Sequence, residues 1–223
     1  MNFSNFQKIC AELIGTMMLL MIIVGSGIMG ESLAAGNDAI ALLGNTIATG
    51  AGLVVLITIF GPISSAHFNP IVTLAFWHKE KSDFKISLGF IVAQIIGAGL
   101  GVFAAHAMFG QDVLQISTKA RDGLNLGFAE MVASIGLLMT IFGTLKFKPD
   151  AVPTNVGLYI TAAYWFTAST SFANPAVTMA RALSDTFAGI APQSVPQFIA
   201  AQLIGMIVAI GLAKMVFEPN AIK

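Results

Sequence analysis

The chain has 223 residues, of which 56% are hydrophobic and only 10% are charged, and its mean hydropathy is +0.83. A soluble domain carries about 25% charged residues, so this composition excludes a soluble domain and indicates a protein that crosses the membrane several times. Basic and acidic residues balance at eleven each, which removes the basic surface that nucleic-acid binding needs. The single cysteine, Cys10, cannot form an intrachain disulfide, and no Cys/His cluster has metal-ligand spacing. We therefore expect no metal and no cofactor.

Six apolar segments are long enough to cross a membrane, which takes about 20 mostly apolar residues. The first is not a secretory signal, because Glu12 lies inside it and the run recurs later in the chain. Two shorter apolar pieces, 70–77 and 175–183, reach about half way across a bilayer. These patterns predict an all-α membrane protein with six transmembrane helices and two re-entrant half-helices. The six spans lie near 9–29, 40–60, 86–109, 125–145, 153–169 and 197–217.

The basic residues predict the orientation of the chain. In a six-span arrangement Lys119, Arg121 and Arg181 fall on one side and all other basic residues fall on the opposite side. Cytoplasmic loops are enriched in Lys and Arg, so we expect both termini in the cytoplasm. The residues on the cytoplasmic side are Lys8, Lys79, Lys81, Lys85, Lys146, Lys148, Lys214 and Lys223.

Three blocks of sequence recur in the same order. The pairs are AELIGTMMLLMIIVG and AEMVASIGLLMTIFG, NPIVTLA and NPAVTMA, and FIVAQIIG and FIAAQLIG. We expect a single domain over 1–223 that contains two repeats, approximately 1–112 and 120–223. Each repeat has three spans, so the second enters the membrane from the opposite side and the repeat is inverted. Small residues let helices pack closely, which we expect at Gly97, Gly101, Gly205 and Gly211.

Each repeat carries an Asn-Pro pair where its short apolar piece begins. Proline suits the first residue of a helix and asparagine suits the cap before it, which predicts half-helices that start at Pro70 and Pro175. The loops before them, 61–68 and 167–173, are tolerated in a membrane only if protein buries them or they line a watery cavity. We expect the positive N-termini of the half-helices to meet near the midplane. That arrangement disfavours cations and suits neutral hydroxylic solutes.

Together these features resemble the aquaporin family, the major intrinsic proteins, over almost the whole chain. The resemblance includes HFNPIVT, ANPAVT, the buried glutamates and a glutamine in the third and sixth spans. It implies a passive channel in a lipid bilayer, not an enzyme, with one pore in each protomer of a homotetramer. By resemblance, Glu12, Glu130 and His67 support the buried loops. The implied pore motifs are Asn69, Pro70, Ile71, Asn174, Pro175 and Ala176.

The selectivity filter is where this sequence departs from the family. The resemblance places the filter at Thr49, Ala162, Ser171 and Val177, and most members carry an arginine at the last of these positions. The small residues imply a wide, weakly polar filter, similar to a subgroup associated with bacterial arsenic-resistance operons. The implied solutes are water, glycerol, arsenite and methylated arsenicals, and the implied location is a bacterial inner membrane.

Arg181 follows Val177 by one helical turn, so the two share a helix face. This spacing makes Arg181 a candidate for the outer vestibule of the pore, where it would partly replace the missing filter arginine. The alternative is a surface ion pair with Asp185, which is also four residues away.

Two functions other than a passive channel stay open on the sequence. Inverted repeats with broken helices also describe ion-coupled secondary transporters, and intramembrane carboxylates such as Glu12 and Glu130 are typical of ion paths. A non-conducting membrane scaffold with a closed pore is the other alternative.

Overall fold

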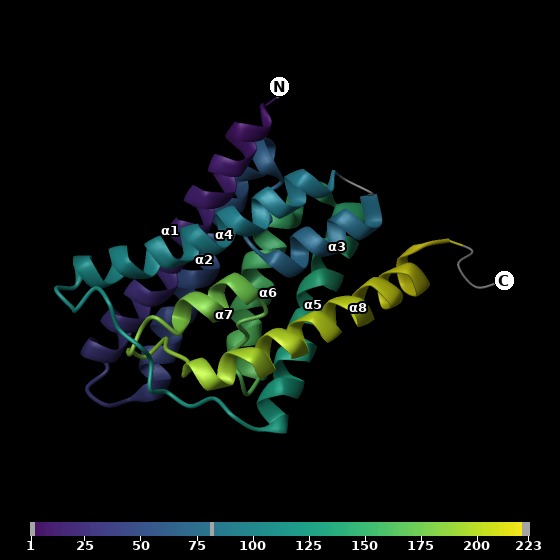
Figure 1. Ribbon diagram of the computed structural model, residues 1–223. Helices are drawn as coiled ribbons and strands as arrows, with labels where there is room; N and C mark the ends of the chain where they lie inside the picture. Colours follow the sequence, from purple (N-terminus) through teal and green to yellow (C-terminus); the bar gives the residue numbers. More distant parts are fainter. Residues whose placement is uncertain (1–2, 81–82, 220–223) are drawn as a thin grey trace.

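The structure is a computed structural model that describes residues 3–80 and 83–219, and within these residues every regular element is a helix (Figure 1). Two lysines used for the predicted orientation, Lys81 and Lys223, lie outside the described residues. Two short 3₁₀ turns, Pro149–Ala151 and Pro192–Ser194, precede the sixth and the last α-helix. The α-helices are α1 Asn5–Leu33, α2 Asp38–Ser64, α3 Pro70–Glu80, α4 Phe84–Met108, α5 Leu124–Phe147, α6 Val152–Phe166, α7 Pro175–Arg181 and α8 Val195–Phe217.

Both halves of the chain show the same succession of helices, in which a short helix precedes the last long one. Among the described residues, α1, α2, α4, α5 and α8 are long and apolar enough to cross a membrane. The remaining predicted span, 153–169, is shorter than expected: α6 has 15 residues, about 22 Å at 1.5 Å per residue. It ends at Phe166 because Thr167 turns to an extended conformation that begins the second buried loop.

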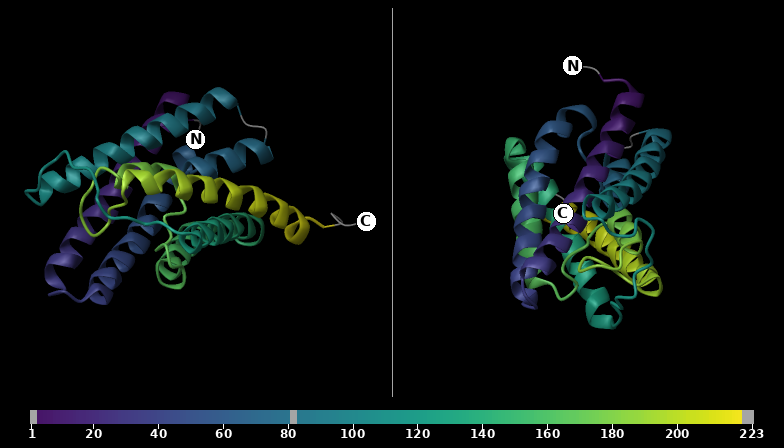
Figure 2. Two further views of the ribbon diagram at one scale, coloured as in Figure 1. Left: turned by 60° about the horizontal axis from the view of Figure 1, so that its bottom comes forward. Right: turned by 90° about the vertical axis from the view of Figure 1, so that its left-hand side faces the viewer.

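The two half-helices occur as predicted, and each packs between helices of both halves. Short helix α3 contacts α4 and α8, and α7 also contacts α4 and α8. Figures 1 and 2 show α3 and α7 lying end to end in the space between these two long helices. The chain halves are therefore interlocked at the level of their broken segments.

The first buried loop is shorter than predicted. The sequence places it at 61–68, but α2 continues past Pro62 and ends at Ser64. The Ser64 hydroxyl donates a 2.6 Å hydrogen bond to the Glu12 carboxylate, which fixes the last turn of the helix against α1. The chain leaves the helix at Ser65, whose φ of 71° is left-handed. The loop before Pro70 thus comprises only 65–69.

Glycines let the long helices approach at backbone distance. A Cβ added at Gly97 or Gly101 of α4 would lie 2.3 or 2.2 Å from a backbone oxygen of α1, and one at Gly205 of α8 would lie 2.7 Å from the Met131 oxygen of α5. These three positions are close-packed, as predicted. The prediction for Gly211 is wrong, because nothing lies within 4 Å of a Cβ there.

The ends of the fold lie on two sides. In Figure 1, α1 runs from the upper right to the lower left and α8 runs from left to right, so the start of α1 and the end of α8 lie toward the same side. The α1–α2 connection and the linker between α4 and α5, residues 109–123, lie toward the opposite side. We call this opposite side the linker side.

Candidate pore

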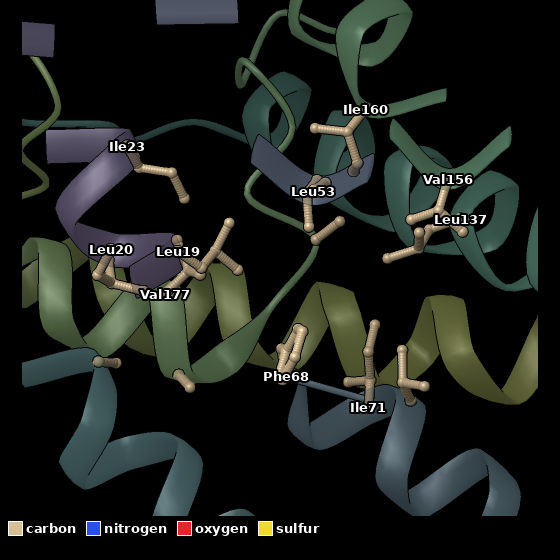
Figure 3. Close-up of a cluster of buried hydrophobic side chains, with 14 of the residues drawn as sticks. Leu19, Leu20, Ile23, Leu53, Phe68, Ile71, Leu137, Val156, Ile160 and Val177 are labelled. Atoms are coloured by element: carbon tan, nitrogen blue, oxygen red, sulfur yellow. The ribbon is translucent and has the colours of Figure 1, made fainter. Parts of the chain in front are cut away.

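A cavity of about 230 Å³ lies between the two halves. Most of its wall is apolar and comes from α1, α2, α5 and α6; Figure 3 shows several of these side chains within the buried hydrophobic cluster. Both buried loops contribute to the polar part of the wall. The apolar wall includes Leu19, Ile23, Leu53, Leu137, Val156 and Ile160, and the loop residues include His67, Asn69, Ser171 and Asn174.

Asn69 and Asn174 both line the cavity and cap their half-helices. The Asn174 side-chain oxygen accepts from the Ala176 and Val177 amides at 3.0 and 3.3 Å, and that of Asn69 accepts from the Ile71 amide at 3.1 Å. Each side-chain nitrogen donates across to the other loop. Because a carboxamide has two N–H donors, each asparagine keeps a second N–H beside the cavity.

Glu12 and Glu130 each accept hydrogen bonds from one buried loop. Glu12 accepts from the His67 and Phe68 amides at 2.9 and 2.7 Å. The corresponding donors to Glu130 are the amides of Phe172 and Ala173, both at 2.8 Å. Neither glutamate is among the cavity-lining residues. Their geometry is that of loop anchors placed behind the cavity wall.

A glutamine completes each anchor in the same way. The Gln94 amide donates to Glu12 at 2.7 Å and to the Thr73 hydroxyl at 2.9 Å. Gln202 repeats both bonds, at 2.7 and 2.9 Å, to Glu130 and Thr178. The repeat seen in the sequence is therefore also a repeat of hydrogen bonds.

The loops hold left-handed backbone at non-glycine residues. Phe68 and Ala173, which directly precede the two asparagines, have φ values of 47° and 46°. Such a conformation costs about 1–3 kcal/mol per residue and persists only where surrounding contacts determine it. Both residues donate their amide N–H to a buried glutamate. The glutamates thus stabilise the conformation that presents the asparagines.

His67 lines the cavity on the side of α3. Its ring stacks on Phe76 with centroids 5.0 Å apart, and its Nδ1 lies 3.2 Å from the Thr73 hydroxyl. Its backbone N–H is one of the donors to Glu12. His67 therefore combines a loop contact with a position on the cavity wall.

The structure contradicts the assignment of Ala162 to the filter. Ala162 is exposed on the outside of α6, whereas Val156, Ile160 and Tyr164 line the cavity at intervals of four residues. A position two residues away is rotated by about 200° at 3.6 residues per turn, which turns Ala162 away from the cavity. Tyr164 occupies the place expected for Ala162, and its hydroxyl donates a 3.4 Å hydrogen bond to Thr49.

The other three filter candidates lie together on the cavity wall. Thr49 comes from α2, Ser171 from the second loop and Val177 from the first turn of α7. The Ser171 hydroxyl is buried without a hydrogen-bond partner. With Tyr164, the group contains three hydroxyls and one apolar side chain, and the hydroxyl of Ser171 is buried behind the cavity surface.

Arg181 also lines this cavity, and it does not pair with Asp185. Asp185 is exposed and accepts hydrogen bonds from the Thr118 amide and hydroxyl, at 2.8 and 3.0 Å. These bonds lower the pKa of the Asp185 carboxyl from its usual value of 3.8. Of the two sequence-based alternatives for Arg181, the geometry favours a place at the cavity.

Comparisons with known proteins agree with this architecture. The profile of the Major intrinsic protein family matches residues 1–169. A relative from Rhizobium meliloti, named aquaglyceroporin AqpS, is 48% identical over 218 residues, which cover 98% of this chain and 93% of the relative. The chain belongs to the major intrinsic protein family.

More distant major intrinsic proteins extend the comparison. The probable aquaporin AqpM of Archaeoglobus fulgidus is 28% identical over 236 residues, covering 94% of this chain and 96% of that protein. The X-ray structure of the aquaglyceroporin from Plasmodium falciparum superposes with a TM-score of 0.77 and covers 98% of this chain and 99% of that one. At 19% identity this likeness concerns the fold.

As a major intrinsic protein, the chain is a membrane channel and not an enzyme. Its geometry agrees with that class: among the described residues that line the cavity, none is a carboxylate. The two intramembrane glutamates, whose carboxylates suggested an ion path, lie behind the wall and not at the cavity.

Sequence reasoning missed several residues that line the pore of this major intrinsic protein or pack beside it. Counting back from Asn174 assigned the filter position to Ala162 and not to Tyr164, because the intervening segment has weak internal similarity. Phe172 carries the ring on which two arginines lie. Arg121 belongs to the linker, and no motif surrounds it. A four-residue interval of Val156, Ile160 and Tyr164 was the one available signal for the inner face of α6.

Proposed function

We propose that this major intrinsic protein conducts water and small neutral hydroxylic solutes, with glycerol as the representative solute. The observation that supports the proposal is the mixed wall of the cavity. Most of the wall is aliphatic, and its polar residues include Thr49, Tyr164 and the two asparagines. A polyol has a carbon face and a hydroxyl face, so both find a matching surface. The name of the Rhizobium meliloti relative, an aquaglyceroporin, supports the same solute class.

Arsenite extends the proposal, because neutral arsenious acid also presents hydroxyl groups. The resemblance to the arsenic-resistance subgroup supports arsenite and methylated arsenicals as further solutes. The filter would lack the usual arginine, since Val177 stands in that position. Tyr164 makes it narrower than Ala162 would have done, so we expect glycerol-sized solutes to be favoured over larger ones.

We also propose the assembly and orientation of the channel. The chain forms one channel domain of two inverted repeats, approximately 1–112 and 120–223, and four copies associate in a bacterial inner membrane. Both termini face the cytoplasm, so the linker side is external. Apolar side chains exposed on the outer helix faces, such as Ile47 and Val55 of α2, suit contact with lipid or another protomer.

Light scattering from reconstituted proteoliposomes tests the proposed function under osmotic gradients of water, glycerol and arsenite. We expect rapid flux of all three without an ion gradient. A flux that requires a pH or sodium gradient would instead show a coupled transporter, and absence of all flux from correctly folded protein would show a scaffold.

A matched pair of variants tests the filter. Thr49→Phe places a ring on the cavity wall, so we expect glycerol flux to fall at least about tenfold, with a smaller loss of water flux. Ala162→Phe places the same ring on the exposed face of α6 and should leave both fluxes unchanged. Equal behaviour of the two variants would contradict the assignment of the filter.

A further inference from the structure

The outer part of the cavity contains a guanidinium that does not come from the usual filter position. Val177 gives the first turn of α7 no charge, but Arg181 lies one turn later on the same face and lines the same cavity. Its side chain is only 2% exposed. A charge buried to this degree is retained only where specific contacts hold it.

Two contacts hold the Arg181 guanidinium in place. Its central carbon lies 3.5 Å from the centroid of the Phe172 ring, and its Nε donates to the Ala188 carbonyl. The ring belongs to the second buried loop, directly before Ala173 and Asn174. Stacking on an aromatic face is a preferred arrangement for arginine. The side chain is therefore fixed against the filter loop.

One donor of this guanidinium has no partner in the protein. The Nη1 nitrogen is buried and makes no hydrogen bond, and the Ser171 hydroxyl on the same wall is also buried without a partner. Buried polar groups normally have partners, so each such exception calls for an explanation. Nη1 itself is out of reach of the cavity, whereas Nη2 is not among the buried atoms and makes no hydrogen bond, so a solute or water in the cavity would bind the guanidinium at Nη2.

The acidic side chain that acts electrostatically on Arg181 is Glu130, whose carboxylate lies behind the cavity wall and accepts from the Phe172 and Ala173 amides. A second positive charge comes from Arg121, whose guanidinium carbon lies 5.1 Å from the same Phe172 ring. Arg121 is bound to the Gly189 carbonyl at 2.9 Å and does not line the cavity. Both charges on the ring are positive, so the potential at this end of the cavity disfavours cations.

We propose that Arg181 supplies the cationic donor that the filter lacks at Val177. The inference rests on the proposed function. The guanidinium donates Nη2–H to the hydroxyl oxygen of a passing solute and repels hydronium and metal cations. Because it is displaced by one turn, it leaves the Val177 position small, so that glycerol passes beside an apolar surface. Cation exclusion and polyol flux are thereby assigned to different residues.

The test compares proton and potassium leak with glycerol and water flux in the same proteoliposomes. We expect Arg181→Gln to raise the cation leak at least about tenfold while water flux is kept. Arg181→Lys keeps the charge and should keep the leak low. Lys148→Gln, which removes an exposed positive charge just after α5 and outside the cavity lining, should leave the leak at the wild-type level.

A rescue variant tests whether the guanidinium itself excludes cations, and Arg181→Lys keeps the inference testable if Arg181→Gln does not fold. Val177→Arg combined with Arg181→Gln returns a guanidinium to the first turn of α7, so it should restore cation exclusion and reduce glycerol flux more than water flux. An unchanged cation leak in folded Arg181→Gln, or a leak in the rescue variant as high as in Arg181→Gln, overturns the inference. Wild-type protein that conducts no glycerol overturns the proposed function itself, and the inference with it.

Discussion

Asn69 and Asn174 each hydrogen bond to the carbonyl that directly precedes the other one. The Asn69 side-chain nitrogen donates to Ala173 at 2.8 Å, and the Asn174 nitrogen donates to Phe68 at 2.8 Å. Each asparagine therefore does two jobs, because its oxygen caps its own half-helix while its nitrogen ties the opposite loop. The two bonds close a symmetric brace between the halves of the chain.

The brace predicts that the capping bond of each asparagine and its bond to the opposite loop contribute separately to stability. Asn69→Asp keeps the capping oxygen but removes the donor to the Ala173 carbonyl, whereas Asn69→Ala removes both. An unsatisfied buried carbonyl costs about 1–3 kcal/mol, and a lost cap costs about 1 kcal/mol more. We expect thermal unfolding in detergent to rank wild type above Asn69→Asp and Asn69→Ala lowest. Equal stability of Asn69→Ala and wild type would contradict the brace.

The two loop anchors, Glu12 and Glu130, accept different numbers of hydrogen bonds. The same substitution should therefore have different effects at the two positions. Glu12 accepts two bonds at each oxygen, including the Ser64 hydroxyl, so a glutamine loses two acceptor bonds whichever way it turns. Glu130 accepts only the Phe172 amide at Oε1, so a glutamine there loses one. Hydrogen bonds to charged groups are worth about 1.5–3 kcal/mol. We expect Glu12→Gln to lower the unfolding temperature more than Glu130→Gln.

Size-exclusion chromatography of the solubilised protein checks that each variant is folded. A second pair of variants, at the two glutamines, gives the control for this comparison. Gln94 and Gln202 donate to the two glutamates in the same geometry, so Gln94→Leu and Gln202→Leu should have similar effects on stability. If Glu130→Gln proves as damaging as Glu12→Gln, the count of bonds at each oxygen does not set the stability of the loops.

Most of the architecture was predictable because the two halves of the chain share the same blocks of sequence. The Asn-Pro pairs, the two glutamates and the glutamines recur at corresponding positions, and repeated residues fold into repeated hydrogen bonds. Helix lengths were predictable from the spacing of apolar runs, except where a helix stops against a buried loop. That is why α2 was placed too short and α6 too long.

The filter was less predictable, because membrane helices are apolar on every side. In α6, Ala162 and Tyr164 are equally compatible with an inner or an outer face, and only packing against α2 decides between them. The contacts of Arg181 depend on Phe172 and Ala188, which follow no motif. These long-range contacts depend on tertiary packing, so no sequence motif predicts them.

Two glycines on one helix predict opposite effects of the same substitution. A Cβ at Gly101 would lie 2.2 Å from the Met17 oxygen, whereas nothing lies within 4 Å of a Cβ at Gly99. Overpacking of this kind costs about 1–3 kcal/mol, and Gly→Ala in a helix otherwise stabilises by about 0.4–1 kcal/mol. We expect Gly101→Ala to lower the unfolding temperature and Gly99→Ala to leave it equal or higher. Destabilisation by both would show that helix flexibility, and not the α1–α4 contact, is the cause.

The tie between Asp185 and Thr118 fixes the linker to the chain beyond α7 and predicts a dependence on pH. The pKa of Asp185 is lower in the folded protein than its usual 3.8, because the Thr118 amide and hydroxyl donate to the carboxylate. A lowered pKa adds stability above the unfolded value, and that stability is lost as the pH falls through the folded value. Above about pH 5, Asp185→Asn should therefore unfold at a lower temperature than wild type.

As the pH falls below the lowered pKa of Asp185, the two proteins should approach the same unfolding temperature, because the wild-type carboxyl is then protonated as well. Thr118→Val keeps the backbone donor and removes only the hydroxyl bond, so its effect at neutral pH should be smaller than that of Asp185→Asn. Limited proteolysis of residues 109–123 at pH 7 measures the same tie directly, and we expect faster cleavage in Asp185→Asn. A difference in unfolding temperature that does not shrink as the pH falls through the lowered pKa of Asp185 would mean that the charge of Asp185 does not hold the linker.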